Sequence, residues 1–430
     1  MGKGLYKSWQ DLSVLVSWYQ QPQNINSNTN NQHVSYKIRS MAGLHMFSRR
    51  VRHILSARST QVVLACVFIL SALRYVIVHN YRREPPILTI TLDSLVEPPD
   101  FNWTNVYNVQ YAATPIHLCN ALMLWSQIER IGSRAQRLMY YPSHWSPDEI
   151  DDSDPEKELT PIARLLTSAI EDYAVTLQPL DVLHENNPSR ETWAGCFTKF
   201  LAFNLTEYSR VLVIDSAATL YQHIDDLFFL PASPIAMPYV YWGEPEGWQF
   251  SSHLMLITPT PTEFSKINDA VRAAGPEEYD VDILNTIYNK NQILRIPQRP
   301  FNLLSGEFRR RSHGEYLASS GSSKKKELWD PEEISNDVKY MHFSDWPIPE
   351  PWIKTSKEVL NKYMPRCAKS EWFGATDCRA REMWLQLYVD FQRRRKAICG
   401  KGFELLGEEE ASKIMGEGHG KERLFHPDER

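Results

Sequence analysis

Asp215 is the first residue whose type and position could do chemistry, because it directly follows a hydrophobic run. Residues 211–214 are Val-Leu-Val-Ile, which predicts a buried strand, and the chain continues as Asp-Ser-Ala. A carboxylate at the end of such a strand can hold a hard metal ion or a ligand that carries phosphate. Two carboxylates spaced by one residue are the usual arrangement, yet Ala217 occupies the second position. Three hypotheses follow: a working metal site, a site with fewer ligands, or only a strand end.

Strands and helices alternate around Asp215, and this alternation predicts how it is positioned. Short strand-like segments cover residues 106–113, 136–142, 176–183 and 210–215. Apolar residues at helical spacing lie between them, over residues 115–132, 161–173 and 191–205. This alternation is typical of an α/β domain with a parallel sheet wound in the Rossmann manner. Ligands bind such sheets at the carboxyl ends of the strands, where Asp215 is expected.

A long apolar segment near the N-terminus predicts a membrane anchor. Residues 60–78 contain one charged residue, Arg74, and a helix of this length nearly spans a hydrocarbon core of about 30 Å. Basic residues are denser before the segment than after it, which places the N-terminus in the cytosol and the C-terminal part in the lumen. The alternative is a buried helix of a soluble domain. The prediction divides the chain into a disordered cytosolic tail (1–58), a transmembrane signal anchor (59–80), a proline-rich stem (81–100), a globular domain (101–399) and a flexible tail (400–430).

Charge and cysteine content limit the class of protein further. The net charge of −5 gives no reason to expect nucleic-acid binding. A lumenal location permits disulfides, and Cys367, Cys378 and Cys399 cluster near the C-terminus, which favours one bridge with a spare thiol over a metal site. The sequence leaves the pairing open. Asn102 and Asn204 begin glycosylation acceptor motifs, but Asn204 lies close to a predicted core strand.

Several segments, in a fixed order, resemble fungal family-8-type glycosyltransferases related to glycogenin. They are similar to the N-acetylglucosaminyltransferase, or glucose N-acetyltransferase, group of that family. The resemblance runs from Val106 to about Cys399 and includes "TWAGCFTKFLAFNLTEYSRVLVIDS", "YDVDILN", "LLSGEFR" and "HFSDWP". It implies a GT-A fold for residues 101–399, a UDP-sugar donor, a divalent metal that is usually manganese, and the Golgi membrane as location.

The resemblance also implies which residues form the site. Asp215 matches the first Asp of the family's Asp-x-Asp motif, and His342 of "HFSDWP" matches the distant His that completes the metal site. Lys199 matches a lysine that positions the donor; the alternative is a solvated helix residue. The donor-binding residues expected from the resemblance are Lys199, Asp215, Ser216, His342 and Ser344, and the metal ligands are Asp215 and His342.

Asp280 and Asn285 of "YDVDILN" match the family's sugar-contacting segment and are the predicted catalytic residues. Helix N-capping is the alternative role for Asp280, and a buried core histidine is the alternative for His342. Asp225 and Asp226, by contrast, are expected to begin a short helix rather than to join the site.

Two departures from the family pattern weaken the predicted site. Ala217 cannot ligate a metal, and Glu350 stands where the family has a lysine against the diphosphate. A carboxylate there repels the diphosphate, by about 4 kcal/mol for unit charges 4 Å apart at an effective dielectric of 20. Glu307 and Asp345 are candidate replacements for the missing carboxylate.

These observations leave two functional hypotheses. The first is a membrane-anchored glycosyltransferase that transfers a sugar, N-acetylglucosamine by resemblance, from a UDP-sugar to a glycan acceptor of mannan or N-glycan type with retention. The metal, though weakly held, would neutralise the diphosphate leaving group. The second is a catalytically impaired protein of the same fold that serves as a Golgi binding or scaffold protein.

Overall fold

The computed structural model describes residues 65, 68–74, 95–153, 155–180, 197–243, 249–275, 278–288, 292–318, 328–369 and 376–407. The chain divides into two compact units, Met1–Pro85 and Pro86–Arg430. In the first unit, residues 68–74 are helical and exposed. No helix within the described ranges is both long and apolar enough to cross a membrane. Most of the predicted anchor, the whole cytosolic tail and most of the stem lie outside the described residues.

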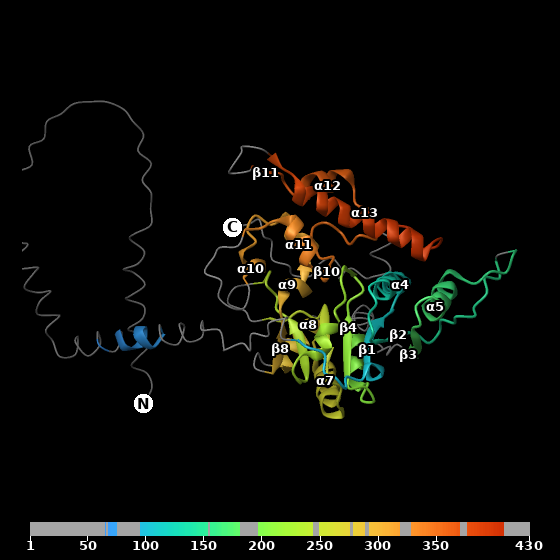
Figure 1. The fold of residues 1–430 in the computed structure, drawn as a ribbon, viewed down its shortest axis with the longest axis horizontal. Helices are drawn as coiled ribbons and strands as arrows, with labels where there is room; N and C mark the ends of the chain where they lie inside the picture. The colour runs from blue at the N-terminus through green and yellow to red at the C-terminus, as the bar shows by residue number, and fades with distance from the viewer. Residues whose placement is uncertain are drawn as a thin grey trace, which may run out of the picture. The chain divides into compact units, whose positions relative to one another are not determined.

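The second unit is built on a seven-stranded sheet with the order β3-β2-β1-β4-β7-β6-β8 (Figure 1). Its strands are β1 (Val106–Tyr111), β2 (Gln136–Pro142), β3 (Thr176–Leu180), β4 (Arg210–Ile214), β6 (Ile235–Pro238), β7 (Leu254–Ile257) and β8 (Ile293–Ile296). Strands β1 to β4 pair in parallel, as the alternation predicts. The α/β class is confirmed.

Beyond these four strands the sheet is not parallel, because β7 runs antiparallel to both of its neighbours, β4 and β6. The described residues between β6 and β7, 239–243 and 249–253, contain no helix. Antiparallel strands can be joined without one, whereas a parallel pair needs a longer crossover connection. The sheet is therefore mixed, and β7 places the residues that precede it beside the carboxyl end of β4.

The helices between the first strands begin where the sequence predicts. Helix α4 (Pro115–Arg130) is capped by the Thr114 side chain, and α5 (Pro161–Glu171) by Thr160. Both have proline in the first turn, where a missing amide hydrogen costs nothing. Gly132, just past α4, has φ +72°, a left-handed conformation that favours glycine. The predicted helix over 191–205 appears as a 3-10 helix, η3 (Thr198–Asn204), and residues 191–196 lie outside the described part.

Each face of the sheet has its own hydrophobic core. Alternate residues of β4 face opposite sides, so Leu212 and Ile214 pack in the core that includes α4 and α13 (Arg379–Cys399). Val211 and Val213 pack in the second core with η3, α7 (Pro261–Ala273) and α8 (Asp280–Ile287). Figure 1 shows α4 and α13 on one side of the sheet and α7 on the other.

A small second sheet lies next to the end of β4. Its order is β5-β10-β9, with β5 at Ala218–Leu220, β10 at Tyr340–His342 and β9 at Leu303–Leu304. Strand β10 pairs antiparallel with β5 and in parallel with β9. This pairing brings the "HFSDWP" segment to the turn that follows Asp215.

The remaining elements are short, and the last two strands of the chain form a separate two-stranded sheet. They are η2 (Trp103–Asn105), η4 (Asp225–Phe229), α9 (Gln298–Phe301), η5 (Ser305–Arg309), α10 (Gly314–Leu317), α11 (Pro331–Asp337), α12 (Lys357–Tyr363), β11 (Ala368–Lys369) and β12 (Thr376–Asp377). Asp225 and Asp226 begin η4, as predicted.

Two disulfides hold the C-terminal segment, and one of them corrects the expected spare thiol. Cys367 pairs with Cys378, whereas Cys399 pairs with Cys119 at a sequence separation of 280. Cys399 is therefore not spare: it fastens the end of α13 to α4. The sequence could not show this, because the partner lies in a helix near the start of the domain.

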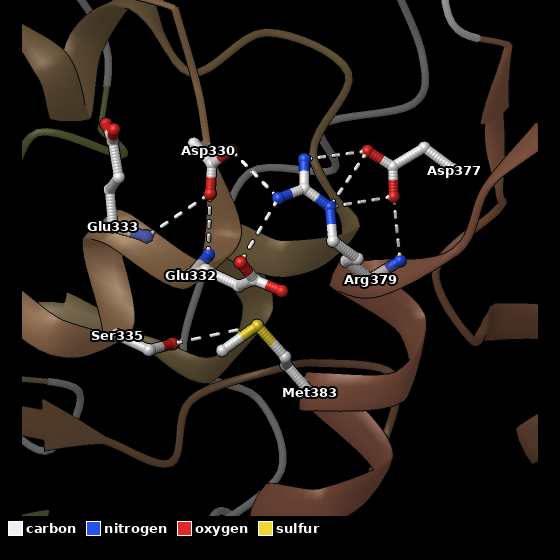
Figure 2. A network of polar contacts seen from close by, with 7 residues as sticks. All are labelled: Asp330, Glu332, Glu333, Ser335, Asp377, Arg379 and Met383. Carbon is white, nitrogen blue, oxygen red and sulfur yellow. Dashed lines mark hydrogen bonds and ion pairs between the residues drawn. The ribbon is translucent and has the colours of Figure 1, made fainter.

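A polar network holds the start of α13 (Figure 2). The Arg379 guanidinium lies 2.9 Å from carboxylate oxygens of both Asp377 and Asp330 and 3.5 Å from Glu332. Asp330 also caps α11 by accepting from the backbone N–H groups of Glu332 and Glu333. The helix is thus tied to α11 at one end and to α4 at the other.

The two disulfides should differ in their effect on stability. The chain-entropy model assigns about 5.6 kcal/mol to the Cys119–Cys399 bridge and about 3 kcal/mol to Cys367–Cys378, whose sequence separation is 11. We expect Cys119→Ala/Cys399→Ala to lower the free energy of unfolding more than Cys367→Ala/Cys378→Ala does, as measured by urea denaturation of the purified protein. Equal losses for the two double variants would contradict this prediction.

Candidate functional site

Asp215 faces two of the residues with which it is predicted to act. Its Oδ1 lies 3.6 Å from Nε2 of His342 and accepts a hydrogen bond of 2.9 Å from the backbone N–H of Ala217. Its Oδ2 lies 3.9 Å from Nζ of Lys199. The side chain is 28% exposed, so the carboxylate remains accessible to a ligand. Asp215 therefore does more than end a strand, although it also stabilises the following turn.

Strand pairing explains why His342 lies so close to Asp215. In the β5–β10 ladder His342 is opposite Ala218, and the Phe343 N–H donates to the carbonyl of Ala217 at 2.8 Å. On the other side, the Asp215 N–H donates to the carbonyl of His253, just before β7, at 2.9 Å. Backbone hydrogen bonds thus fix both neighbours of the Asp215 turn.

Lys199 and Asp280 form an ion pair beside Asp215. The Lys199 Nζ lies 2.7 Å from Oδ2 of Asp280, and the two side chains are only 17% and 11% exposed. Lys199 comes from η3 and is not a solvated helix residue. Asp280 is the first residue of α8 and not its cap, because Tyr279 is the N-cap and its N–H donates to the Asp282 carboxylate at 3.0 Å. Lys199 therefore bridges the two carboxylates that the sequence singles out.

Asn285, the other residue predicted to contact the sugar, is engaged within the protein. Its Oδ1 accepts from the Phe250 N–H at 2.8 Å, and its Nδ2 donates to the carbonyls of Phe250 at 2.9 Å and Val281 at 2.8 Å. These bonds join α8 to the segment that leads into β7. Its contact with a sugar stays a prediction.

Ser216 and Ser344 lie in the two segments that meet at the site. Both side chains are largely buried. Ser216 follows Asp215 directly, and the Ser344 N–H donates to the carbonyl of His342 at 3.1 Å. Their part in donor binding stays a prediction.

The surroundings of Asp215 keep its carboxyl group ionised. Burial acts to raise the pKa of Asp215, but the polar contact with Nε2 of His342 and the positive charge of Lys199 outweigh it. The pKa of Asp215 therefore lies well below its usual range. The Asp215 carboxylate is therefore negatively charged at neutral pH and can attract a cation.

A stack of three rings, which the sequence analysis missed, lies behind His342. The His253 and His342 rings are 3.7 Å apart between centroids at an interplanar angle of 4°, and Trp242 stacks on His253 at 5.7 Å and 7°. The only signal in the sequence was a histidine directly before a hydrophobic strand, which by itself indicates nothing.

The two carboxylates considered as replacements for Ala217 are held elsewhere. Asp345 accepts hydrogen bonds from Nε1 of Trp384 at 2.6 Å and from the Tyr388 hydroxyl at 3.1 Å. Glu307 contacts Nδ1 of His313 at 2.8 Å. Burial raises the pKa of Asp345 to about 6 and raises that of Glu307 as well. Within the described residues, no group of three His, Cys, Asp or Glu side chains could hold a metal ion.

The donor set therefore fits a divalent cation only in part. Two ligands of one ion, each about 2 Å from it, can lie as far apart as the 3.6 Å between Asp215 Oδ1 and His342 Nε2. Manganese prefers six ligands, mostly oxygen. Because Ala217 offers none, the diphosphate and water would have to supply the remaining ligands.

Comparison with known proteins gives relatives in one group. No family model matches the chain. It is 38% identical over 301 residues to Glucose N-acetyltransferase 1 of Gibberella zeae. The match covers 69% of this chain but only 63% of that protein. It is 35% identical over 337 residues to Glucose N-acetyltransferase 1 of Aspergillus fumigatus, over 75% of this chain and 83% of that protein.

Solved structures are more distant. The bifunctional glycosyltransferase WbbM is 11% identical with a TM-score of 0.41, over 70% of this chain and 50% of that one. The galactosyltransferase LgtC, in complex with donor and acceptor sugar analogs, is 13% identical with a TM-score of 0.37, over 66% of this chain and 95% of that one.

Loss of the ion pair between Lys199 and Asp280 should lower the free energy of unfolding. Lys199→Met removes the cation beside the largely buried Asp280 carboxylate, and Asp280→Asn removes the nearer of the two carboxylates beside Lys199. We expect each to cost about 3 kcal/mol in urea denaturation. The double variant should lose less than the sum of the two, because the second change removes the orphaned charge. Lys266→Met is the control: its ammonium lies 3.7 Å from Glu263, but the lysine side chain is 36% exposed, so the change should cost under about 1 kcal/mol. Additive losses at Lys199 and Asp280 would show that the two charges do not interact.

Proposed function

The chain belongs to the glucose N-acetyltransferase family, and from that premise we propose that it is a glycosyltransferase that uses a UDP-sugar. The proposed reaction transfers N-acetylglucosamine from UDP-N-acetylglucosamine to a glycan acceptor with retention of configuration. The observation that carries the proposal is the convergence of Asp215, Lys199, Asp280 and His342 from separate elements at the carboxyl end of β4. Ligands of α/β sheets bind at that edge.

The charges of these residues suggest how the donor is held. Asp215 and Asp280 carry two negative charges against the single positive charge of Lys199. The cluster by itself therefore does not attract a diphosphate, and a divalent cation that arrives with the nucleotide would balance the charge. When bound, manganese would neutralise the diphosphate as the glycosidic bond breaks. In this proposal Asp215 and His342 hold the cation, while Lys199 and Asp280 orient the donor.

A second candidate function is a protein that binds the donor or a glycan without turnover. Ala217 and Glu350 favour it, because the first removes a ligand and the second adds a negative charge to the segment that follows β10. Such a protein would act as a binding or scaffold protein in the Golgi.

Replacing these two residues should distinguish the candidates. Ala217→Asp adds a second carboxylate and Glu350→Lys removes a repulsion, so each should tighten manganese-dependent UDP binding by about one to two powers of ten. The two effects should couple, because both act on one diphosphate–metal unit. Calorimetric titration of the purified full-length protein with UDP and UDP-N-acetylglucosamine, with and without manganese, measures this. Ala217→Asn and Glu350→Gln are the matched controls and should give smaller gains.

Turnover decides between the two functions. Hydrolysis of UDP-N-acetylglucosamine by the double variant but not by the parent would favour the binding protein. Equal and substantial hydrolysis by both would show that the native site is active and that Ala217 and Glu350 do not prevent catalysis. A parent that binds neither UDP nor the UDP-sugar would contradict both candidates.

We further propose that the protein is a single-pass type II protein of the Golgi membrane with its C-terminal part in the lumen. The apolar segment 60–78 with its basic upstream flank supports this topology. The two disulfides also support it, because such bonds persist in oxidising compartments. Both Asn102 and Asn204 are exposed, so burial does not prevent glycosylation at either position, contrary to the concern about Asn204.

Protease protection tests this topology. In sealed microsomes that contain the full-length protein, we expect the part that follows residue 80 to resist an added protease because the membrane shields it. Detergent should abolish the protection. Digestion of the C-terminal part in intact microsomes would exclude the proposed orientation.

A further inference from the structure

The orientation of His342 lacks the hydrogen bond that usually fixes a histidine at a ligand site. A metal-binding histidine normally donates its second ring nitrogen to a carboxylate, a carbonyl or water, and this bond sets the ring plane. Here Nε2 of His342 faces Asp215, while Nδ1 is buried and has no hydrogen-bond partner among the described residues. No hydrogen bond at Nδ1 sets the ring plane among the described residues, so another contact must do so.

His253 is the group that contacts the ring face. Its imidazole lies parallel to that of His342, with centroids 3.7 Å apart and an interplanar angle of 4°. Trp242 stacks on the other face of His253, with the two ring centroids 5.7 Å apart. Both histidines are more than nine-tenths buried. A rotation of the His342 ring out of its plane would therefore collide with His253, and the stack restricts that rotation.

The backbone of His253 is fixed to both strands that carry the site. Its carbonyl accepts from the Asp215 N–H at 2.9 Å and from the Tyr340 hydroxyl at 3.0 Å. Its N–H donates to Oγ of Ser251 at 3.2 Å. Because Tyr340 is in β10 with His342, the residue that supports the ring is anchored to the same strand and to the end of β4.

We propose that His253 is a positioning residue: stacked between Trp242 and His342, it holds Nε2 of His342 toward Asp215 and thereby sets the affinity for the donor diphosphate. This inference rests on the proposed binding of a UDP-sugar at Asp215 and His342. His253 needs only its ring for this role, so another aromatic residue should replace it. Nothing in the role requires a proton or a metal bond at His253.

UDP titration of the purified full-length protein, in the presence of manganese, tests the proposal. Loss of the stacked ring in His253→Ala should weaken UDP binding by about tenfold, the value of one aromatic contact. His253→Phe keeps a ring and should stay within about threefold of the parent. Trp242→Ala loosens the stack from its far end without emptying the space beside His342, and should weaken binding by about threefold. Trp242→Ala also tests the role of the stack if His253→Ala does not fold.

Coupling separates positioning from a general loss of stability. In a His342→Ala background, His253→Ala should have no further effect on UDP affinity, even if it still lowers the melting temperature. Tyr340→Phe is the control for the backbone tie: it removes the hydroxyl bond to the His253 carbonyl but keeps the stack, so stability should fall while UDP affinity stays unchanged.

The outcomes distinguish this inference from the proposed function. A parent that binds UDP, with His342→Ala weaker and His253→Ala unchanged, would overturn the positioning role and leave the function standing. A loss of affinity in His253→Phe equal to that in His253→Ala would also overturn it, because the imidazole itself would then be needed. A parent that does not bind UDP would overturn the proposed function and this inference with it.

Discussion

The pairing of β10 with β5 is the interaction on which the site depends. Strand β5 begins shortly after Asp215, and its ladder with β10 places His342 opposite Ala218. Side chains alternate across a strand, so a slip of one residue would turn His342 to the opposite face, away from Asp215. The carbonyl of Ala217 extends the same ladder through the Phe343 N–H. Thus Ala217, which cannot serve as a ligand, still contributes through its backbone.

Charge is the second constraint on this part of the molecule. Burying Asp215, Asp280 and Lys199 together costs solvation energy, which their mutual attraction offsets only in close geometry. The short Lys199–Asp280 contact meets this condition, while the longer Lys199–Asp215 contact leaves Asp215 open on one side. A cluster with one excess negative charge is better suited to a cation and a diphosphate together than to a diphosphate alone.

Helix α13 holds the segment after β10 in place through hydrogen bonds to Asp345. Asp345, three residues after His342, receives hydrogen bonds from Trp384 and Tyr388 of α13 and an ion pair from Arg309. Gly306 allows η5 to approach the same segment closely, because a Cβ there would lie 2.9 Å from the Ser344 carbonyl oxygen. The disulfide of Cys399 and the network around Arg379 hold the helix at both ends. The helix therefore positions the site without reaching it.

The sequence by itself determined the features that follow from local pattern. The alternation of strands and helices and the place of Asp215 at a strand end depend on neighbours a few residues apart, and periodicity reports these. The resemblance to a family then related Lys199 and His342 to Asp215. The lack of a ligand at Ala217 was also visible, because it concerns one residue type.

Only the tertiary structure decided the rest. The antiparallel direction of β7, the Cys119–Cys399 bridge, the bonds of Asn285 to Phe250 and the stack of His253 on His342 each join segments distant in sequence. Strand direction depends on how the connecting chain returns, and a disulfide partner or a stacked ring depends on which surfaces meet in the folded core. Local sequence carries no signal for either, since the same residues could serve in other surroundings.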